Sequence, residues 1–293
     1  MNFKTNLLLG LSIGALAFCS PKKQTEEKPE TTIADPKKES TPIGLQLYTV
    51  RDAMAANPDS TLELVAKLGY KQLELAGYAD GKFYGMAPEQ FKSTAEGYGL
   101  SPISAHISID ALAENPELAI SASKAAGLEY VVLPWLSPDQ RNSVAQYESH
   151  IALMNKVGPM CSEAGLKFAY HNHAFEFDTL DGQVPMEMII NQTNPEHVAI
   201  ELDLYWVSKA GLDPVAFFNK YPGRFNLWHV KDMDDTPEQN FTEVGSGTID
   251  YKSIFENAEV SDMQYFFVEQ DRSDNPMKSI EISYQYVDEL LNQ

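Results

Sequence analysis

Eight short apolar segments along the chain each carry a polar or aromatic side chain near the C-terminal end. The segments are residues 43–48, 71–76, 103–107, 130–135, 167–173, 198–205, 225–232 and 265–271. A strand that is buried on both faces normally excludes such groups, because a desolvated charge without a partner costs several kcal/mol. Their recurrence at the same end of each segment predicts one shared site. Parallel (β/α)8 barrels hold their chemistry at this end of the strands.

Between these segments a helix-like stretch, a glycine and the next strand recur in the same order. Gly69, Gly99, Gly127 and Gly165 hold the glycine position, and Gly223 holds it in an altered form. Glycine readily adopts the left-handed conformation that ends a helix. Alternating strands and helices without hairpin signals indicate parallel strands with right-handed crossovers. The chain therefore predicts an α/β fold, a closed (β/α)8 TIM barrel over residues 42–293. A doubly wound open sheet is the alternative.

The first 41 residues are predicted to lie outside the barrel. An apolar run over residues 7–18 is too short to span a membrane and has the form of a signal-peptide core. It ends at Cys19 in a sequence similar to a bacterial lipoprotein cleavage site, so we predict a signal peptide over 1–19 and a lipid on Cys19. The alternative is a plain secretory signal with an incidental cysteine. Residues 20–41 are rich in Lys, Glu, Thr and Pro and predict a flexible tether.

Charge and cysteine content narrow the choice of partners. The formal net charge of −20 argues against a nucleic-acid partner, because a phosphate backbone attracts clustered Lys and Arg. Cys161 is the one cysteine after Cys19, so the barrel is expected to lack an intrachain disulfide and a thiolate metal cluster. The expected protein is an exported lipoprotein of the periplasm or outer membrane that contacts the membrane through its lipid anchor. We allow for a homo-oligomer.

Asp203, His229 and Glu269 lie at the ends of the last three strand segments, which are neighbours in a barrel. Two carboxylates and one imidazole suit one divalent metal ion, such as Mn²⁺, Mg²⁺, Co²⁺ or Zn²⁺. A fourth ligand is expected from the fifth segment, where two histidines and Glu176 are candidates. The alternative for any single residue is a local ion pair or helix cap. That alternative is less plausible for four adjacent strand ends together.

The motifs YHNHAFEF (170–177), ELDLYW (201–206), WHVKD (228–232) and FVEQD (267–271), opened by GLQLYTVRD (44–52), resemble a known superfamily. It is the xylose isomerase-like TIM barrel superfamily, which includes sugar phosphate isomerases/epimerases, ketose 3-epimerases, inosose dehydratases and endonuclease IV. The chain is most similar to secreted Bacteroidetes-type members with Y-H-N-H on the fifth strand. The resemblance implies metal ligands from strands five to eight, which correspond here to Asp203, His229 and Glu269.

The fifth strand departs from the pattern of this superfamily. Many members carry Glu-Asn-His where this chain has His171-Asn172-His173. Either His171 takes the place of the glutamate ligand, or Glu176 reaches the metal from just beyond the strand. We favour Glu176, because a third carboxylate suits a hard cation. This choice leaves His171 and His173 for catalysis.

The other strand ends predict a sugar pocket. Lys231 is expected to stabilise an oxyanion or protonate a leaving group, with a solvent-exposed lysine as the alternative. His106 is expected to contact a substrate hydroxyl, with a core histidine as the alternative. The remaining predicted substrate contacts are Gln46, Tyr48, Glu74 and Trp135.

The predicted activity is that of a metal-dependent isomerase, epimerase or lyase acting on a small carbohydrate in the cell envelope. A divalent ion stabilises the enediolate that forms when the α-proton of a keto- or 3-oxo-sugar is removed, and a positioned base removes that proton. Reprotonation gives an epimer or isomer, whereas loss of a β-leaving group gives elimination. One alternative is a sugar-binding lipoprotein without turnover. The other is an endonuclease-IV-like repair enzyme, and the negative charge and the predicted export both argue against this second alternative.

Overall fold

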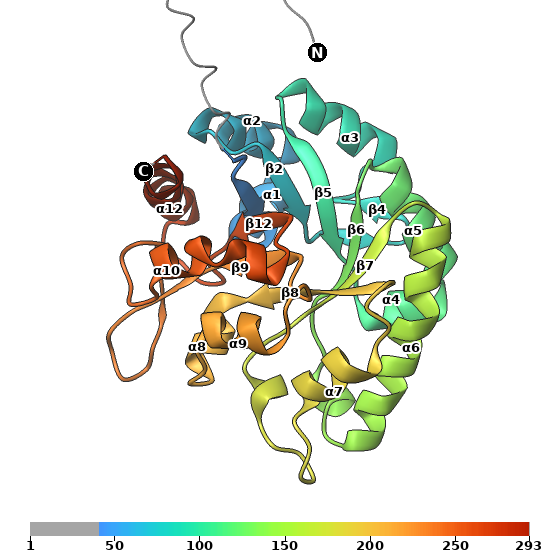
Figure 1. Ribbon diagram of the computed structural model, residues 1–293. Coiled ribbons are helices and arrows are strands. Elements are labelled where there is room, and N and C mark those ends of the chain that lie inside the picture. Colours follow the sequence, from blue (N-terminus) through green and yellow to red (C-terminus); the bar gives the residue numbers. More distant parts are fainter. Residues whose placement is uncertain (1–40, 293) are drawn as a thin grey trace, which may run out of the picture. The chain divides into compact units, whose positions relative to one another are not determined.

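Eight parallel strands close into a barrel in the order β1-β12-β9-β8-β7-β6-β5-β2, with helices around the outside (Figure 1). The computed structural model describes residues 41–292. The predicted signal peptide, the lipid on Cys19 and the tether up to residue 40 lie outside these residues. The prediction of a (β/α)8 TIM barrel is confirmed, and the open-sheet alternative is wrong because β1 pairs with both β2 and β12.

The barrel strands are β1 (Gly44–Gln46), β2 (Gln72–Leu75), β5 (Ser101–His106), β6 (Tyr130–Leu133), β7 (Lys167–His171), β8 (Val198–Asp203), β9 (Leu227–Val230) and β12 (Tyr265–Val268). Two small hairpins lie outside the barrel sheet, β3 (Tyr78–Ala79) with β4 (Lys82–Phe83) and β10 (Asp232–Met233) with β11 (Phe241–Thr242). Each barrel strand except β5 lies within its predicted segment; β5 begins two residues earlier, at Ser101.

The helices are α1 (Arg51–Ala56), α2 (Pro58–Leu68), α3 (Pro88–Gly97), α4 (Ile109–Glu114), α5 (Pro116–Ala125), α6 (Val144–Glu163), α7 (Pro185–Gln192), α8 (Leu204–Lys209), α9 (Pro214–Lys220), α10 (Tyr251–Glu256), α11 (Ala258–Ser261) and α12 (Pro276–Leu291). Three short 3-10 helices are η1 (Leu47–Val50), η2 (Pro138–Gln140) and η3 (Phe175–Phe177). Within residues 41–292, no helix combines the length and apolarity needed to cross a bilayer.

Local signals account for where these helices begin and end. Asn57 caps α2, because its side-chain oxygen accepts a hydrogen bond from the backbone N–H of Ser60 at 3.2 Å, and Pro58 occupies the first turn. Gly69 ends the same helix with φ of +114°, a conformation that a residue with a Cβ adopts only with strain. The chain then enters β2 at Gln72. Because all pairs of barrel strands are parallel, their carboxyl ends lie on one side of the barrel.

Two apolar layers hold the barrel. The larger one fills the space between strands and helices, and it includes Leu45, Leu73, Val131 and Ile200. The smaller one blocks the inside of the barrel and consists of Ile103, Tyr130, Val132, Ala169, Ala199, Leu227 and Phe267. We call this second set the barrel floor. Because side chains alternate along a strand, the inward positions two residues after the floor begin the polar site.

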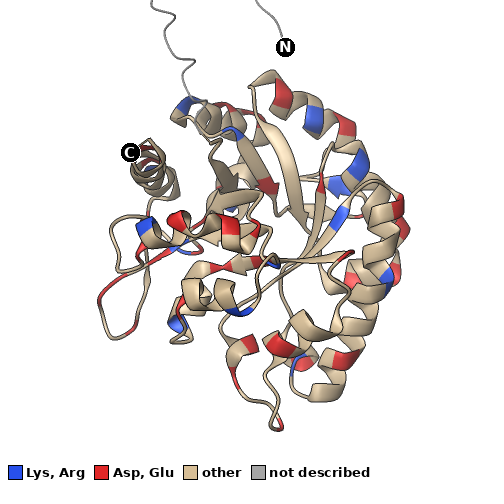
Figure 2. Ribbon diagram, viewed as in Figure 1, with Lys and Arg blue, Asp and Glu red and all other residues tan. Residues whose placement is uncertain are grey.

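Charged residues occur both on the outer helices and in the barrel strands. Figure 2 shows acidic residues on most of the outer helices, with Lys and Arg interspersed among them. Acidic residues also occupy barrel strands, including Glu74, Glu201 and Asp203, which are fully buried. These buried carboxylates, rather than the acidic surface, mark the candidate site.

Candidate metal and substrate site

Two successive layers of polar side chains lie above the barrel floor. The inner cluster consists of Glu74, His106, His171, Glu201 and His229, and the outer cluster consists of Asp203, Lys231, Glu269 and Asp271. Glu201 and Asp203 are two residues apart on β8, so their side chains point to the same side at successive levels. His229 and Lys231 follow the same spacing at the end of β9.

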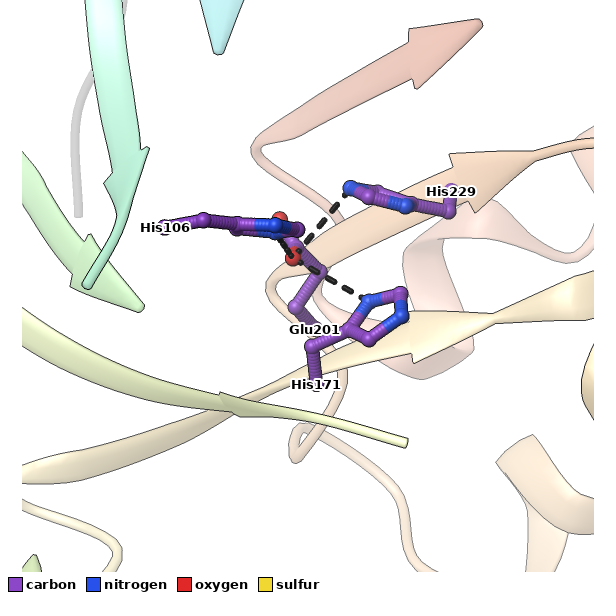
Figure 3. Close-up of side chains that lie close together, drawn as sticks. All are labelled: His106, His171, Glu201 and His229. Carbon is purple, nitrogen blue, oxygen red and sulfur yellow. Dashed lines mark hydrogen bonds and ion pairs between the residues drawn. The ribbon is translucent and has the colours of Figure 1, made fainter. Parts of the chain in front are cut away.

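The inner cluster converges on the carboxylates of Glu201 and Glu74. Figure 3 shows Glu201 with the three histidines around it. Glu201 Oε2 lies 3.0 Å from His106 Nε2, 3.3 Å from His171 Nδ1 and 3.2 Å from His229 Nε2. Glu74 Oε2 lies 3.2 Å from His106 Nε2 and 2.5 Å from His229 Nε2. Gln46 supports Glu74 from below by donating a hydrogen bond of 2.8 Å to the same oxygen.

The outer cluster is organised around a buried lysine. Lys231 Nζ lies 2.8 Å from Asp203 Oδ2, 2.7 Å from Glu269 Oε2 and 2.8 Å from Asp271 Oδ1. The Lys231 side chain is 2% exposed, which excludes the alternative of a solvent-exposed lysine. His229 joins the two clusters, because its Nδ1 lies 2.7 Å from Glu269 Oε2 and 3.8 Å from Asp203 Oδ2.

Burial and neighbouring charges set the protonation of the clusters. Burial would lower the pKa of His106, but the carboxylates of Glu74 and Glu201 outweigh it and raise the pKa to about 9. Burial likewise would raise the pKa of Glu269, but Lys231 and His229 hold it at about 2. Burial lowers the pKa of His173 to about 3 and that of His171 well below its ordinary value, with nearby cations adding to the effect. Two neutral imidazoles therefore stand beside charged groups at neutral pH.

A cavity of about 480 Å³ opens above the clusters. Among the predicted site residues, it is lined by Tyr48, His106, Trp135, His171, His173, Lys231 and Glu269. Tyr48 and Trp135 remain 42% and 46% exposed, so their rings are accessible at the opening and are not buried in the core. An aromatic wall opposite hydrogen-bonding groups suits the two sides of a sugar ring.

Not every predicted residue reaches this cavity. Gln46 and Glu74 are fully buried beneath it, so the structure places them as supports of the inner cluster and not as surfaces open to a substrate. Glu176, predicted as the fourth metal ligand, is not brought together with Asp203, His229 and Glu269. Its two oxygens accept hydrogen bonds from the Tyr170 hydroxyl at 2.6 Å and from the His173 backbone N–H at 2.8 Å.

His171, the other candidate for the fourth ligand, lies nearer to that set. Its Nε2 is 3.6 Å from Asp203 Oδ2, and its ring centre is 4.4 Å from that of His229. Residue His173 is oriented instead by aromatic packing, because the Phe175 ring stacks on it at 5.3 Å with an 8° interplanar angle. The two histidines of the motif thus point to different places.

Three functional positions were missed by the sequence reasoning. Glu201 and Asp271 lie two residues from Asp203 and Glu269, so the two-residue spacing of inward positions was the available signal. Asn172 accepts a hydrogen bond of 3.0 Å from the Asp203 backbone N–H through Oδ1, and thereby holds β8 against the end of β7. Its place between two conspicuous histidines obscured this role.

A larger cavity of about 980 Å³ flanks the first. Tyr205, Trp206 and Phe241 form its aromatic wall, and Arg51 and Gln270 are among its polar lining residues. The two cavities share neighbours, because the Trp206 ring lies 5.3 Å from the His173 ring and the Arg51 guanidinium lies 4.3 Å from the Tyr48 ring centre. The second cavity offers room for a substituent larger than one sugar ring.

Comparisons with known proteins agree with this arrangement. A family model described as xylose isomerase-like TIM barrel matches residues 62–290. An inosose dehydratase of Geobacillus kaustophilus (strain HTA426) is 24% identical over 278 residues, which cover 80% of this chain and 87% of the relative. A sugar phosphate isomerase/epimerase structure from Parabacteroides distasonis ATCC 8503 superposes with a TM-score of 0.75 at 24% identity, covering 89% of this chain and 98% of that one. The IolI protein with a bound zinc atom gives a TM-score of 0.70 at 16% identity, covering 86% and 98%.

Proposed function

This chain belongs to the xylose isomerase-like TIM barrel family, and on that premise we propose that it is a divalent-metal-dependent enzyme acting on a carbohydrate. The observation that carries the proposal is the convergence of Asp203, His229 and Glu269, whose ligand atoms lie within 4.8 Å of one another. Glu269 also lines the 480 Å³ cavity, so a group bound by this set would face a substrate there.

The donor atoms fit a metal ion. Asp203 Oδ2, His229 Nδ1 and Glu269 Oε2 are buried and make no hydrogen bond of good geometry within residues 41–292, although the last two lie 2.7 Å apart and Lys231 is at ion-pair distance from both carboxylates. Two carboxylate oxygens and an imidazole are ordinary ligands for Mn²⁺, Co²⁺ or Zn²⁺, and His171 is the nearest candidate for a fourth. A divalent ion bound there supplies Lewis acidity toward a carbonyl and an adjacent hydroxyl oxygen of the substrate.

The protein side chains supply the proton chemistry. His173 faces the cavity, and burial, which holds its pKa at about 3, keeps it neutral and able to accept the α-proton of a keto- or 3-oxo-sugar. Negative charge that develops on the substrate raises the proton affinity of the imidazole during the transfer. Lys231 carries a positive charge into the same cavity, where it stabilises an oxyanion or protonates a leaving group.

Within this scheme we favour β-elimination. Relatives of this chain carry the name inosose dehydratase. Loss of water from a β-hydroxy ketone is an elimination that can begin with removal of the proton next to the carbonyl. The second cavity would accommodate the leaving part of a glycoside. Together with the lipoprotein signal read from residues 1–19, this supports a lyase acting on a 3-oxo-glycoside at the cell envelope.

The first experiment measures metal content and proton exchange on the purified protein. Elemental analysis is followed by incubation with 3-oxo-glucosides and free ketoses in D₂O, observed by NMR. We expect deuterium next to a carbonyl or release of the aglycone. Both signals should fall by about 10²-fold or more in Asp203→Asn, because the variant lacks one metal ligand. A chelator should have the same effect, because it removes the metal itself.

The possible results contradict different parts of the proposal. Bound metal without exchange on any of these compounds would contradict the substrate class while leaving the metal site intact. A protein that binds saccharides but no metal would contradict catalysis and support a sugar-binding lipoprotein.

A further inference from the structure

We propose that the inner cluster is a transition-metal site in its own right, distinct from the set of Asp203, His229 and Glu269. Its donors are His106, His171, Glu201 and His229, whose ligand atoms lie within 4.8 Å of one another, with Glu74 beside them. The five residues come from five strands of the barrel, and His229 is shared with the outer set. Figure 3 shows three imidazoles directed at the Glu201 carboxylate from different sides. The inference does not depend on the reaction proposed above.

The spacing of the donor atoms matches a coordination shell. Donors about 2.0–2.1 Å from a metal lie roughly 3.3 Å apart in a tetrahedron and roughly 2.9 Å apart in an octahedron. The two His106 contacts measure 3.0 and 3.2 Å, and Glu201 Oε2 lies 3.2 Å from His229 and 3.3 Å from His171. The contact of 2.5 Å between Glu74 and His229 is the one that must widen when an ion enters.

The inner cluster also contains buried polar atoms that an ion would satisfy. Glu74 Oε1, Glu201 Oε1 and His171 Nδ1 have no hydrogen-bond partner within the described part of the chain, and all three residues are 2% exposed or less. Leaving such atoms unpaired costs about 1–3 kcal/mol each. A ligand that reaches these atoms would therefore stabilise the inner cluster.

The distribution of cationic side chains separates the two clusters. Lys231 is within ion-pair distance of the outer carboxylates of Asp203, Glu269 and Asp271. For Glu74 and Glu201, by contrast, the ion-pair partners within residues 41–292 are histidines. The outer carboxylates thus have a lysine beside them, whereas the countercharges of the inner carboxylates are imidazoles, which can release their protons. A divalent cation that takes the place of those protons would serve as the countercharge of the inner cluster.

The donor set indicates the class of metal. Imidazole nitrogens favour ions such as Zn²⁺ and Co²⁺, whereas Mg²⁺ and Ca²⁺ select oxygen ligands. His229 directs Nε2 to the inner carboxylates and Nδ1 to the outer ones, so it connects the two sites through one ring. We infer that the inner site selects a zinc-like ion.

Cobalt is the probe that tests the site, because bound Co²⁺ has visible absorption that reports its ligands. The purified protein is stripped with chelator and titrated with Co²⁺, and metal per chain and the absorption spectrum are recorded. We expect Glu201→Gln and His106→Gln each to lose one equivalent of tightly bound Co²⁺ and its absorption band. The matched control Glu176→Gln removes a buried carboxylate outside both clusters and should bind Co²⁺ as the parent does.

Further measurements keep the test decisive. Circular dichroism confirms that each variant folds, and the partly exposed His106 is the substitution expected to disturb folding least. Asp203→Asn should retain the inner band while losing metal from the outer set. If both inner variants bind as many equivalents of Co²⁺ as the parent, with the same spectrum, the inference is overturned. Failure of the proposed reaction with the inner band intact would instead contradict only the proposed function.

Discussion

At the scale of single residues, the Glu176 carboxylate stabilises the turn that follows β7. Its two oxygens hold the Tyr170 hydroxyl and the His173 backbone N–H, which fixes the chain as it leaves β7. Burial raises the pKa of this carboxyl from its ordinary 4.5 to about 7, against these hydrogen bonds, which lower it. The residue is therefore predicted to affect stability and not metal binding.

A stability profile against pH tests this role. A carboxyl with a raised pKa binds its proton more tightly in the folded state, so the free energy of unfolding falls as pH rises from about 4.5 to about 7. Glu176→Gln removes the ionisable group, and the variant should gain stability relative to the parent across this window, by up to roughly 3 kcal/mol above pH 7. Urea unfolding at several pH values measures it. A difference that is constant with pH would contradict the assignment.

The residue scale also shows what the sequence reveals about the site. Asp203, His229 and Glu269 were predicted to converge because each ends a recognisable strand, and they do lie together. Glu201 was not, since it lies inside an apolar strand where a charge has no visible partner in sequence. Its partners, His106 and His171, come from other strands, and only the closed barrel brings them within 3.3 Å. Contacts across the barrel depend on strand register and tilt, which one-dimensional spacing does not encode.

At the scale of elements, one side chain, that of Asp232, accepts four backbone hydrogen bonds from the segment that follows it. Asp232 Oδ1 accepts hydrogen bonds from the backbone N–H groups of Met233 and Ile249, and Oδ2 accepts them from Gly245 and Gly247. A long connection at the mouth of a barrel is commonly a lid or a substrate-contacting segment. Phe241, Asn240 and Glu243 from this segment do line the larger cavity. Gly245 and Gly247 surround a carboxylate of the protein itself.

Asp232→Ala is expected to loosen this segment selectively. Four backbone donors lose a charged acceptor, and a loss of at least about 1.4 kcal/mol in local stability corresponds to roughly tenfold faster cleavage by a protease. Limited proteolysis with mass spectrometry should locate the new cuts within residues 234–250. The exposed Asp235→Ala serves as the matched control and should leave the cleavage rate unchanged. Equal rates in both variants would show that Asp232 does not hold the loop.

At the scale of the whole molecule, the first and last strands close the barrel at a point where there is no room for a side chain on Gly44. Gly44 begins β1, and a Cβ there would lie 2.5 Å from the Phe266 carbonyl oxygen and 2.5 Å from the Phe267 ring. The closing pair β1–β12 is short, with two residue pairs in register. The alternation of strands and helices predicted a closed barrel, but this close approach depends on how the first and last strands meet. Sequence periodicity alone does not contain it.

Gly44→Ala should therefore destabilise the entire fold. Overpacking against a backbone carbonyl and a buried ring costs about 1–3 kcal/mol, which lowers the melting temperature by several degrees. The control is Gly97→Ala at the end of α3, where nothing lies within 4 Å of the added methyl group. Helix propensity predicts that this control is neutral or more stable by up to roughly 1 kcal/mol. Equal melting temperatures for the two variants would contradict the closure argument.

The barrel floor determines from which end of the barrel the inner cluster can be reached. Val132, Ala169, Leu227 and Phe267 fill the bore below the inner cluster with buried apolar side chains. The cavity lined by Tyr48 and Trp135 opens at the other end, at the carboxyl ends of the strands. An ion bound at the proposed inner site would lie beneath any sugar held in that cavity. The two proposals together therefore imply an order of binding in which the metal enters before the sugar, and a bound sugar would slow the release of the ion.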